Sequence, residues 1–184
     1  MRKLSDYSGR LRPDISLEDF SRDALLSLLQ LYCRLFLAVD GFWYLAVKER
    51  FSDEDALACD MWTWERMSRY ELDRITKSMK VGGKDVVSLI KAFQIEPWMW
   101  NANYTVEVKN QNHVILTFVD CPVLVSLEKE GEGREENICK VVEPKVFRDY
   151  ADYFNPSIQI KALKLPPRKS KDEVACIWEF KAGE

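Results

Sequence analysis

The stretch NYTVEVKNQNHVILTFVDC, residues 103–121, decides the fold class because it predicts a β-hairpin after a long run of helical patterns. In its first half Tyr104, Val106 and Val108 alternate with polar residues, which is the period of a strand with one covered face. The residues KNQN (109–112) supply the turn. The second half is apolar at nearly every position, which predicts a central strand covered on both faces.

The chain before the hairpin reads as helices. A helix is predicted to start at Ser16 as N-cap and to end at Asp40-Gly41, with apolar residues at helical spacing in between. A short helix follows over residues 42–51. Residues 53–80 form a long helix, about 40 Å at 1.5 Å per residue, which Ser52 or Asp53 can cap. A fourth helix over residues 84–93 is stopped by Pro97.

The chain after the hairpin predicts one helix, residues 143–154, and two further strands over residues 157–165 and 173–180. The predicted class is therefore α+β: a helical N-terminal half packed on a mainly antiparallel sheet of about four strands with an inserted helix. We expect a single domain over residues 1–184. It divides into a flexible tail (1–15), a helical part (16–100) and a part with the sheet and a helix (101–184).

Composition narrows the class of protein. The chain has 184 residues, 47% of them hydrophobic, and a net charge of −3, which argues against a general nucleic-acid binder. No uninterrupted run of 18 apolar residues occurs, and the basic N-terminus lacks the apolar stretch of a signal peptide. We therefore predict a cytoplasmic protein without a membrane-spanning segment.

Four residues of the second half have the chemistry of a zinc site: Cys121, Glu136, Cys139 and Cys176. Zinc takes four tetrahedral ligands, and three thiolates with one carboxylate could supply them. Two alternatives stay open: a nucleophilic thiol, or small buried side chains. Any dyad or triad with histidine must use His113, the one histidine of the chain. About 26 Å would separate it from Cys121 along a straight strand.

Five cysteines do not predict a disulfide framework here. Cys33 and Cys59 lie inside helical patterns, where burial in a core is the ordinary explanation.

Aromatic residues predict a ligand pocket for a small apolar or aromatic metabolite. Its candidate lining residues are Trp43, Trp62, Trp98 and Trp178. The alternative is that these rings belong to the core or face a partner. Because Trp62 and Trp64 cannot share one helix face, one of them should look toward a pocket, a loop or a second subunit. A homodimer is thus a further expectation.

Several short motifs, in their order along the chain, carry a family resemblance. They are DGFWYLAVKERF (40–51), CP (121–122), ENICK (136–140), FNPSIQI (154–160) and LPPRKSKDEVACIWEF (165–180). This order resembles an uncharacterised prokaryotic family of cytosolic proteins. That family is distantly similar to the L-2-amino-thiazoline-4-carboxylic acid hydrolase-like family and to vinyl-4-reductase-type ligand-binding domains.

The resemblance implies a small apolar pocket beside a curved sheet, with a zinc held by cysteines and a glutamate in some relatives. Cys121, Glu136, Cys139 and Cys176 match those elements. The chain departs from the pattern at Ala162 and Leu165, where C-x-x-C-P-P would place two further thiols. The resemblance identifies no catalytic residue.

Three functions remain open at this stage. The first is a small-molecule-binding domain, with zinc as its candidate cofactor. The second is a hydrolase of a small cyclic amide or thiazoline carboxylate. The third is a protein-interaction module that works through an aromatic surface on the long helix. None of these patterns decides whether the protein is an enzyme.

Overall fold

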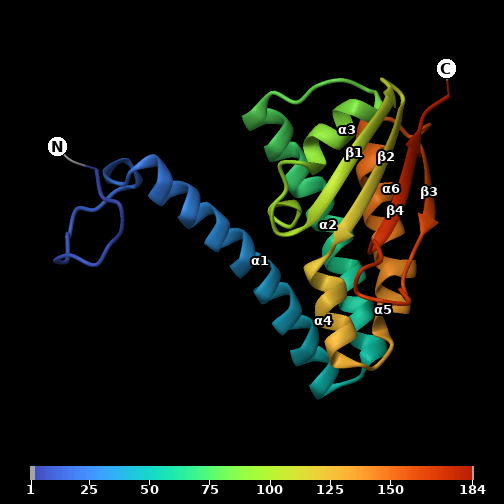
Figure 1. The fold of residues 1–184 in the computed structure, drawn as a ribbon, viewed down its shortest axis with the longest axis horizontal. Coiled ribbons are helices and arrows are strands. Elements are labelled where there is room, and N and C mark those ends of the chain that lie inside the picture. The colour runs from blue at the N-terminus through green and yellow to red at the C-terminus, as the bar shows by residue number, and fades with distance from the viewer. Residues whose placement is uncertain (1–2, 184) are drawn as a thin grey trace.

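A helical layer covers one face of a four-stranded sheet, and one long helix projects from this body (Figure 1). The computed structural model describes residues 3–183. The helices are α1 (Arg22–Arg50), α2 (Asp53–Met79), α3 (Val86–Phe93), α4 (Pro122–Glu130), α5 (Arg134–Asn137) and α6 (Glu143–Phe154). Short 3-10 turns occupy Leu17–Asp19 and Met99–Asn101, and a π-helical turn occupies Ile138–Val142. The strands are β1 (Asn103–Asn110), β2 (His113–Asp120), β3 (Gln159–Lys164) and β4 (Cys176–Lys181). The predicted α+β class is confirmed.

The sheet has the order β1-β2-β4-β3, and every neighbouring pair is antiparallel. The predicted hairpin is present as β1 and β2, and β2 is central. The prediction that both faces of β2 are covered was wrong. Val114, Leu116 and Phe118 are buried, whereas the residues between them are only partly covered. All the helical packing lies on the face of these three residues, so the strand alternates in the usual way.

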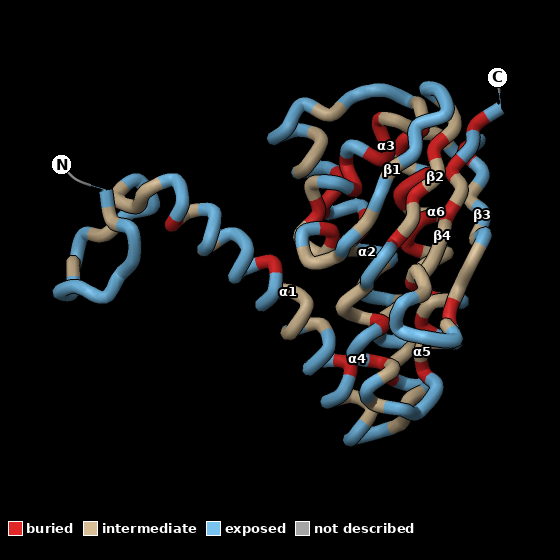
Figure 2. Tube along the Cα trace, viewed as in Figure 1, coloured by how far each residue is buried: buried red, intermediate tan, exposed pale blue. Residues whose placement is uncertain are grey.

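The core lies between this face and the helices α3 and α6, as the red segments of Figure 2 show. It is largely aromatic. The ring of Phe93 stacks on Tyr150 with 4.7 Å between centroids, and Phe147 meets Trp178 edge-on at 4.8 Å. Such pairs contribute about 0.5–1.5 kcal/mol beyond the area they bury. This packing fixes α6 against the sheet.

Helix α1 is one continuous helix, which corrects two predicted boundaries. It begins after Ser21, whose hydroxyl accepts the amide of Ala24 at 3.2 Å, and Ser16 instead caps the 3-10 turn before it. It does not stop at Asp40-Gly41 but runs on to Arg50. A glycine inside a helix costs only about 1 kcal/mol relative to alanine. The apolar residues on both sides of Gly41 outweigh that cost.

Helix α2 is confirmed as a long helix capped by Ser52, whose hydroxyl accepts the amide of Asp55 at 3.0 Å. Its C-terminal cap is Lys80 in the left-handed region, with φ of 54°. It turns back antiparallel to α1 and packs along α6, so it lies in the middle of the helical layer.

The connection between β2 and α6 is helical, whereas the sequence predicted no helix in this connection before residue 143. Helix α4 starts at Pro122, a favoured residue for the first helical position, and ends at Gly131 with φ of 76°. The helix α5 and the π-helical turn then lead directly into α6. The predicted inserted helix is thus one of a series.

Helix α1 also has the length and composition of a membrane-crossing helix. Its mean hydropathy reaches 1.5 over 18 residues, of which 6% are buried. It is the one helix with these properties among residues 3–183. The cytoplasmic location predicted from the sequence stays a prediction.

Two glutamates lie in the core between α2 and the segment before β1. Glu96 is fully buried, and Glu71 is 6% exposed. The indole nitrogen of Trp98 donates a hydrogen bond to Glu96, but one oxygen of each glutamate has no partner among the described residues. Burial raises the pKa of Glu71 to about 8. Burial and then the neighbouring Glu71 raise the pKa of Glu96 well above its usual range.

This pair predicts that the protein loses stability as the pH rises. Both pKa values are higher in the folded chain than in the unfolded chain, so the folded state binds more protons above about pH 4.5. The free energy of unfolding should therefore fall between about pH 5 and pH 8. Glu96→Gln keeps an acceptor for Trp98 and removes the charge. It should raise stability at pH 8 by roughly 1–3 kcal/mol and flatten the profile.

Urea unfolding at several pH values measures this, with the exposed Glu107→Gln as the matched control. A wild-type profile that is flat or rises between pH 5 and pH 8 would contradict the assignment.

Candidate functional site

A groove of about 570 Å³ lies between α1, α2 and α4. Most of its wall is apolar and comes from one side of α1 and from the first turns of α4. Besides Glu130, which pairs with Lys48 and Arg134, two acidic residues lie in this wall: Asp40 from α1 and Asp60 from α2. The apolar lining residues are Leu37, Ala38, Leu45, Pro122, Val123, Leu127 and Ile138. The volume and the mixture of an apolar wall with a few polar groups are typical of small-molecule sites.

Gly41 keeps the middle of this groove open. It lies within α1 beside Asp40, and a Cβ atom built on it would meet nothing within 4 Å. Neither a positive φ nor a close contact inside the chain requires glycine at this position. The helix would be more stable with alanine, so the free space itself is what glycine contributes here.

The two aspartates are partly covered, and this changes their acidity. Burial raises the pKa of Asp40 to about 6. Burial, and then repulsion from Asp40, raise the pKa of Asp60 to about 7. Two cations line the same groove: Lys129, and Arg134, which pairs with Asp53 and Glu130. Among the described residues, neither Asp40 nor Asp60 forms an ion pair with them.

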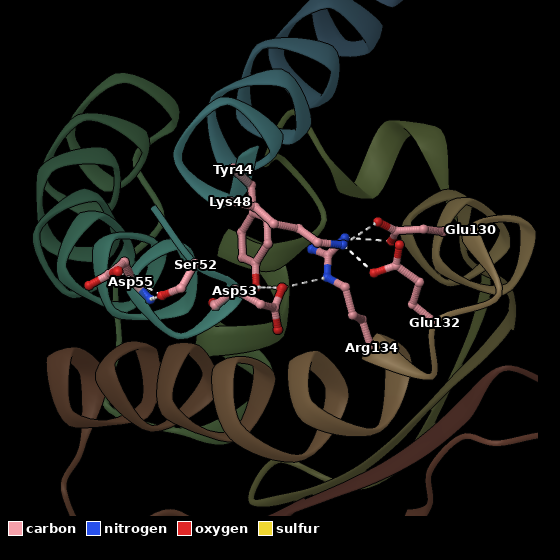
Figure 3. A network of polar contacts seen from close by, with 8 residues as sticks. All are labelled: Tyr44, Lys48, Ser52, Asp53, Asp55, Glu130, Glu132 and Arg134. Carbon is pink, nitrogen blue, oxygen red and sulfur yellow. Dashed lines mark hydrogen bonds and ion pairs between the residues drawn. The ribbon is translucent and has the colours of Figure 1, made fainter. Parts of the chain in front are cut away.

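A network of polar contacts around Arg134 (Figure 3) includes three residues that line the groove: Tyr44, Glu130 and Arg134 itself. Its guanidinium lies over the ring of Tyr44, 4.1 Å from the centroid, and pairs with Asp53 at 3.1 Å and with Glu130. The Tyr44 hydroxyl donates to Asp53 at 3.0 Å. Lys48 pairs with Glu130 at 2.9 Å. The network thereby connects α1, the start of α2, the end of α4 and α5.

Behind the groove, three thiols share a second, much smaller cavity of about 20 Å³. They are Cys121, Cys139 and Cys176, and the carboxyl of Glu143 lines the same cavity. The rings of Trp98, Phe118, Phe147 and Trp178 enclose it. A cavity of this size holds about one water molecule, so it cannot receive an organic metabolite.

The π-helical turn explains how two of these groups meet. The amide of Glu143 donates to the carbonyl of Ile138, five residues earlier, which widens the turn. Cys139 and Glu143 thus both line the cavity, whereas Ile138 lines the groove. Single π-helical turns are rare and occur often at functional sites.

The structure brings the three predicted cysteines together but leaves Glu136 outside. Glu136 is exposed and pairs with Lys140 at 2.6 Å. Glu143, four residues after Cys139, lies where the predicted carboxylate was expected. Burial, followed by Asp60 and Asp40, raises the pKa of Glu143 to about 7. Glu143 therefore connects the thiol cavity electrostatically with the groove.

The thiols are held in the protonated form. Burial raises the pKa of Cys121 to about 11, although the amides at the start of α4 act in the opposite direction. Burial also raises the pKa values of Cys139 and Cys176, with Glu143 adding to both. Cys176 accepts a hydrogen bond from the indole of Trp178 at 3.2 Å. Nucleophilic thiols need lowered pKa values, so this environment is the opposite of an activating one.

The predicted pocket tryptophans separate into two groups. Trp98 and Trp178 both line the thiol cavity. Trp43 and Trp62 are exposed on α1 and α2 and line neither cavity. His113 lies at the opposite end of β2 from Cys121, where its Nε2 is 2.9 Å from Glu179. It is therefore not placed to act as a base for the thiols.

Sequence reasoning missed the residues of the groove: Asp40, Gly41, Asp60 and Arg134. One signal for Asp40 was available, since only Arg34 and Asp40 are charged in the 24 residues from 24 to 47. An isolated acidic residue in an otherwise apolar helical segment indicates a candidate site residue. Asp60 and Arg134 lie in stretches rich in charge, where nothing in the sequence singles them out.

A known family matches almost the whole chain, over residues 18–182, and its description is "Family of unknown function (DUF6125)". The chain belongs to this family. No curated protein matches the chain significantly. No solved structure does so either. Membership agrees with the predicted uncharacterised family, whereas the similarity to hydrolase-like and vinyl-4-reductase-type families gains no support and stays a prediction.

The thiol environments predict one fast-reacting cysteine among five. Cys59 is exposed on α2, whereas Cys33 is buried and the three cavity thiols are covered and protonated. After dialysis against a chelator, titration of the native protein with a chromogenic disulfide at pH 7.5 should show one rapid equivalent. Cys59→Ser should abolish that phase, and Cys121→Ser should leave it unchanged. Rapid labelling of Cys121 would contradict the assignment and indicate an activated thiol.

Proposed function

We propose that this protein binds a small molecule with an apolar body and a cationic group in the groove between α1, α2 and α4. The observation that carries the proposal is the groove itself: about 570 Å³, mostly apolar, with Asp40 and Asp60 in its wall. Its volume lies in the range of small-molecule sites, about 300–1,000 Å³.

The charge of the ligand is inferred from the two aspartates. A carboxylate that loses water on burial is destabilised, and its pKa rises. This is the cause at Asp40, and at Asp60 a hydrogen bond from Trp64 and the charge of Arg134 offset it only in part. An ammonium or amidinium group placed between them would restore the lost interactions through charge-assisted hydrogen bonds, which contribute about 1.5–3 kcal/mol each. The apolar wall beside Gly41 would receive the rest of the ligand.

The proposal predicts a preference for an amine over its uncharged counterpart. 2-Phenylethylamine should bind more tightly than 2-phenylethanol in calorimetric titrations at pH 8. The affinity for the amine should increase from pH 5 to pH 8, because Asp40 and Asp60 ionise in this range while the amine stays charged. Asp40→Asn should weaken amine binding by about tenfold or more.

Two matched variants separate the groove from general effects. Gly41→Leu adds a side chain to the groove wall at a position where a Cβ atom meets nothing within 4 Å, and it should abolish binding. Gln30→Leu changes an exposed site of the same helix and should not. For the charge, Asp23→Asn on the first turn of α1 is the control. Equal affinity for the amine and the alcohol, unchanged in Asp40→Asn, would refute the cationic ligand.

A second proposal concerns zinc at the small cavity. The specific observation in its favour is that three thiols and the Glu143 carboxyl line one cavity without a cation. Thiolate sulfur is a preferred zinc ligand. The fit is incomplete, because no three His, Cys, Asp or Glu side chains within residues 3–183 converge as a metal ion requires.

This second proposal expects close to one zinc per chain in protein purified without chelator, measured by inductively coupled plasma mass spectrometry. Cys139→Ser should remove the metal, and Cys59→Ser, remote from the cavity, should retain it. A zinc content below one tenth per chain in the wild type would end the proposal.

A hydrolase acting on a cyclic amide or thiazoline carboxylate has weaker grounds. The covered thiols are protonated, and His113 lies beyond their reach. An acid–base route through Asp60 or Glu143, whose pKa values lie near 7, is the form of this hypothesis that the residues allow.

A further inference from the structure

Helix α1 carries an apolar stripe whose central part is left exposed by the residues that the structure describes. Its residues recur with alternating steps of three and four, the spacing of a heptad repeat. They are Leu25, Leu28, Tyr32, Leu35, Val39, Phe42 and Ala46, named here the outer seam. The third to sixth of these, from Tyr32 to Phe42, are exposed by 58%, 48%, 68% and 70% in chain order.

The outer seam is separate from the side of α1 that packs on the body. On that inner side Cys33 and Tyr44 are buried, and Phe36 meets Trp64 edge-on at 6.3 Å. Figure 1 shows the N-terminal half of α1 standing away from the rest of the molecule, and Figure 2 shows how little of it is buried. A helix that is apolar on both sides is normally covered on both sides.

We propose that the outer seam is the interface with a second copy of this chain, in which two α1 helices pack antiparallel around a two-fold axis close to Leu37. In that register Leu35 of one copy lies level with Val39 of the other, and Tyr32 lies level with Phe42. Leu28 lies level with Ala46. Every pair joins one position of the heptad to the other, as antiparallel packing of this kind requires, and no charged residue enters the seam.

Two-fold symmetry also accounts for the extent of the exposed surface. Each N-terminal half would cover the exposed aromatic residues on the C-terminal half of its partner. A stable dimer buries about 800 Å² per partner, and a fully covered aromatic side chain hides about 150–250 Å². Tyr32, Phe42 and Trp43 are all more than half exposed, and the leucines at 29, 31 and 35 add to them. The available area is thus of the order that a stable dimer needs.

A membrane is the less favourable occupant. The contact of Phe36 with Trp64, the groove and the Arg134 network fix α1 to the body from Phe36 onward. The apolar part before it, residues 24–35, spans about 18 Å at 1.5 Å per residue, which is short of a hydrocarbon core of about 30 Å. It also contains Arg34, whose insertion costs about 2.5–3.5 kcal/mol or more near the bilayer centre.

Analytical ultracentrifugation of the full chain at micromolar concentrations tests the proposal. The expected species is a dimer of two 21.5 kDa chains. The double variant Leu35→Glu and Val39→Glu places charges at the centre of the seam and should raise the dissociation constant by about 100-fold or more. Val108→Glu on β1, exposed by a similar fraction, is the matched control and should remain dimeric.

Register is tested by mixing two variants, Leu35→Cys and Val39→Cys, under mild oxidation. Disulfides mapped by mass spectrometry should join position 35 of one copy to position 39 of the other. A wild type that is monomeric overturns the proposal without reference to any variant. So does a dimer that persists in the charged double variant, or wild-type flotation with phosphatidylcholine vesicles that the double variant abolishes.

Discussion

Arg134 is the buried charge on which the arrangement of the helices depends. Its guanidinium touches α1 through the ring of Tyr44, α2 through Asp53 and α4 through Glu130. Removing one partner of a buried ion pair costs about 3–5 kcal/mol because the other charge stays behind without compensation. These three helices therefore cannot move independently at this end of the molecule. The groove is the space that their fixed angle leaves open, and the direction in which α1 leaves the body follows from the same contact.

Because α1 continues through Gly41, one helix carries two separate surfaces. One side carries Asp40 and the open space beside it, and both lie in the wall of the groove. Another side carries the outer seam. A break at residue 40, as the sequence pattern predicted, would have disconnected these two surfaces. Because the helix is unbroken, contact with a second copy along the seam would restrict the same segment that forms the groove. The proposed ligand binding and the proposed association of two copies would thereby be mechanically connected.

Carboxyl groups with raised pKa values run through the helical layer from the groove to the core. Repulsion from Asp40 raises the pKa of Asp60, and both aspartates raise the pKa of Glu143. Glu71 and Glu96 form a second interacting pair in the core. Burying such groups lowers stability at neutral pH, so a fold has no packing reason to collect them. Perturbed carboxyls cluster at functional sites more often than elsewhere. The proposed cationic ligand would account for Asp40 and Asp60, whereas Glu143 faces the thiol cavity. The raised pKa values of Glu71 and Glu96 favour their protonated forms.

Hydrophobic periodicity predicted the fold class correctly, because each segment with a regular pattern forms the expected element. These elements are the hairpin, α2, α3 and α6. The predicted boundaries were wrong where packing outweighed a local rule, as at Gly41, which was expected to end a helix. Short helices were missed where glycines and acidic residues are frequent, as in α4 and α5. The site was harder for a physical reason. Cys121, Cys139 and Cys176 were found because sulfur is scarce and chemically distinct. Glu143 was not found, because only its burial distinguishes it from the other carboxylates, and sequence spacing does not show burial. Glu136 is exposed and paired with Lys140, whereas Glu143, which follows the π-helical turn, lines the thiol cavity. The backbone geometry of the π-helical turn, rather than the residue type, thus determines which acid faces the thiols.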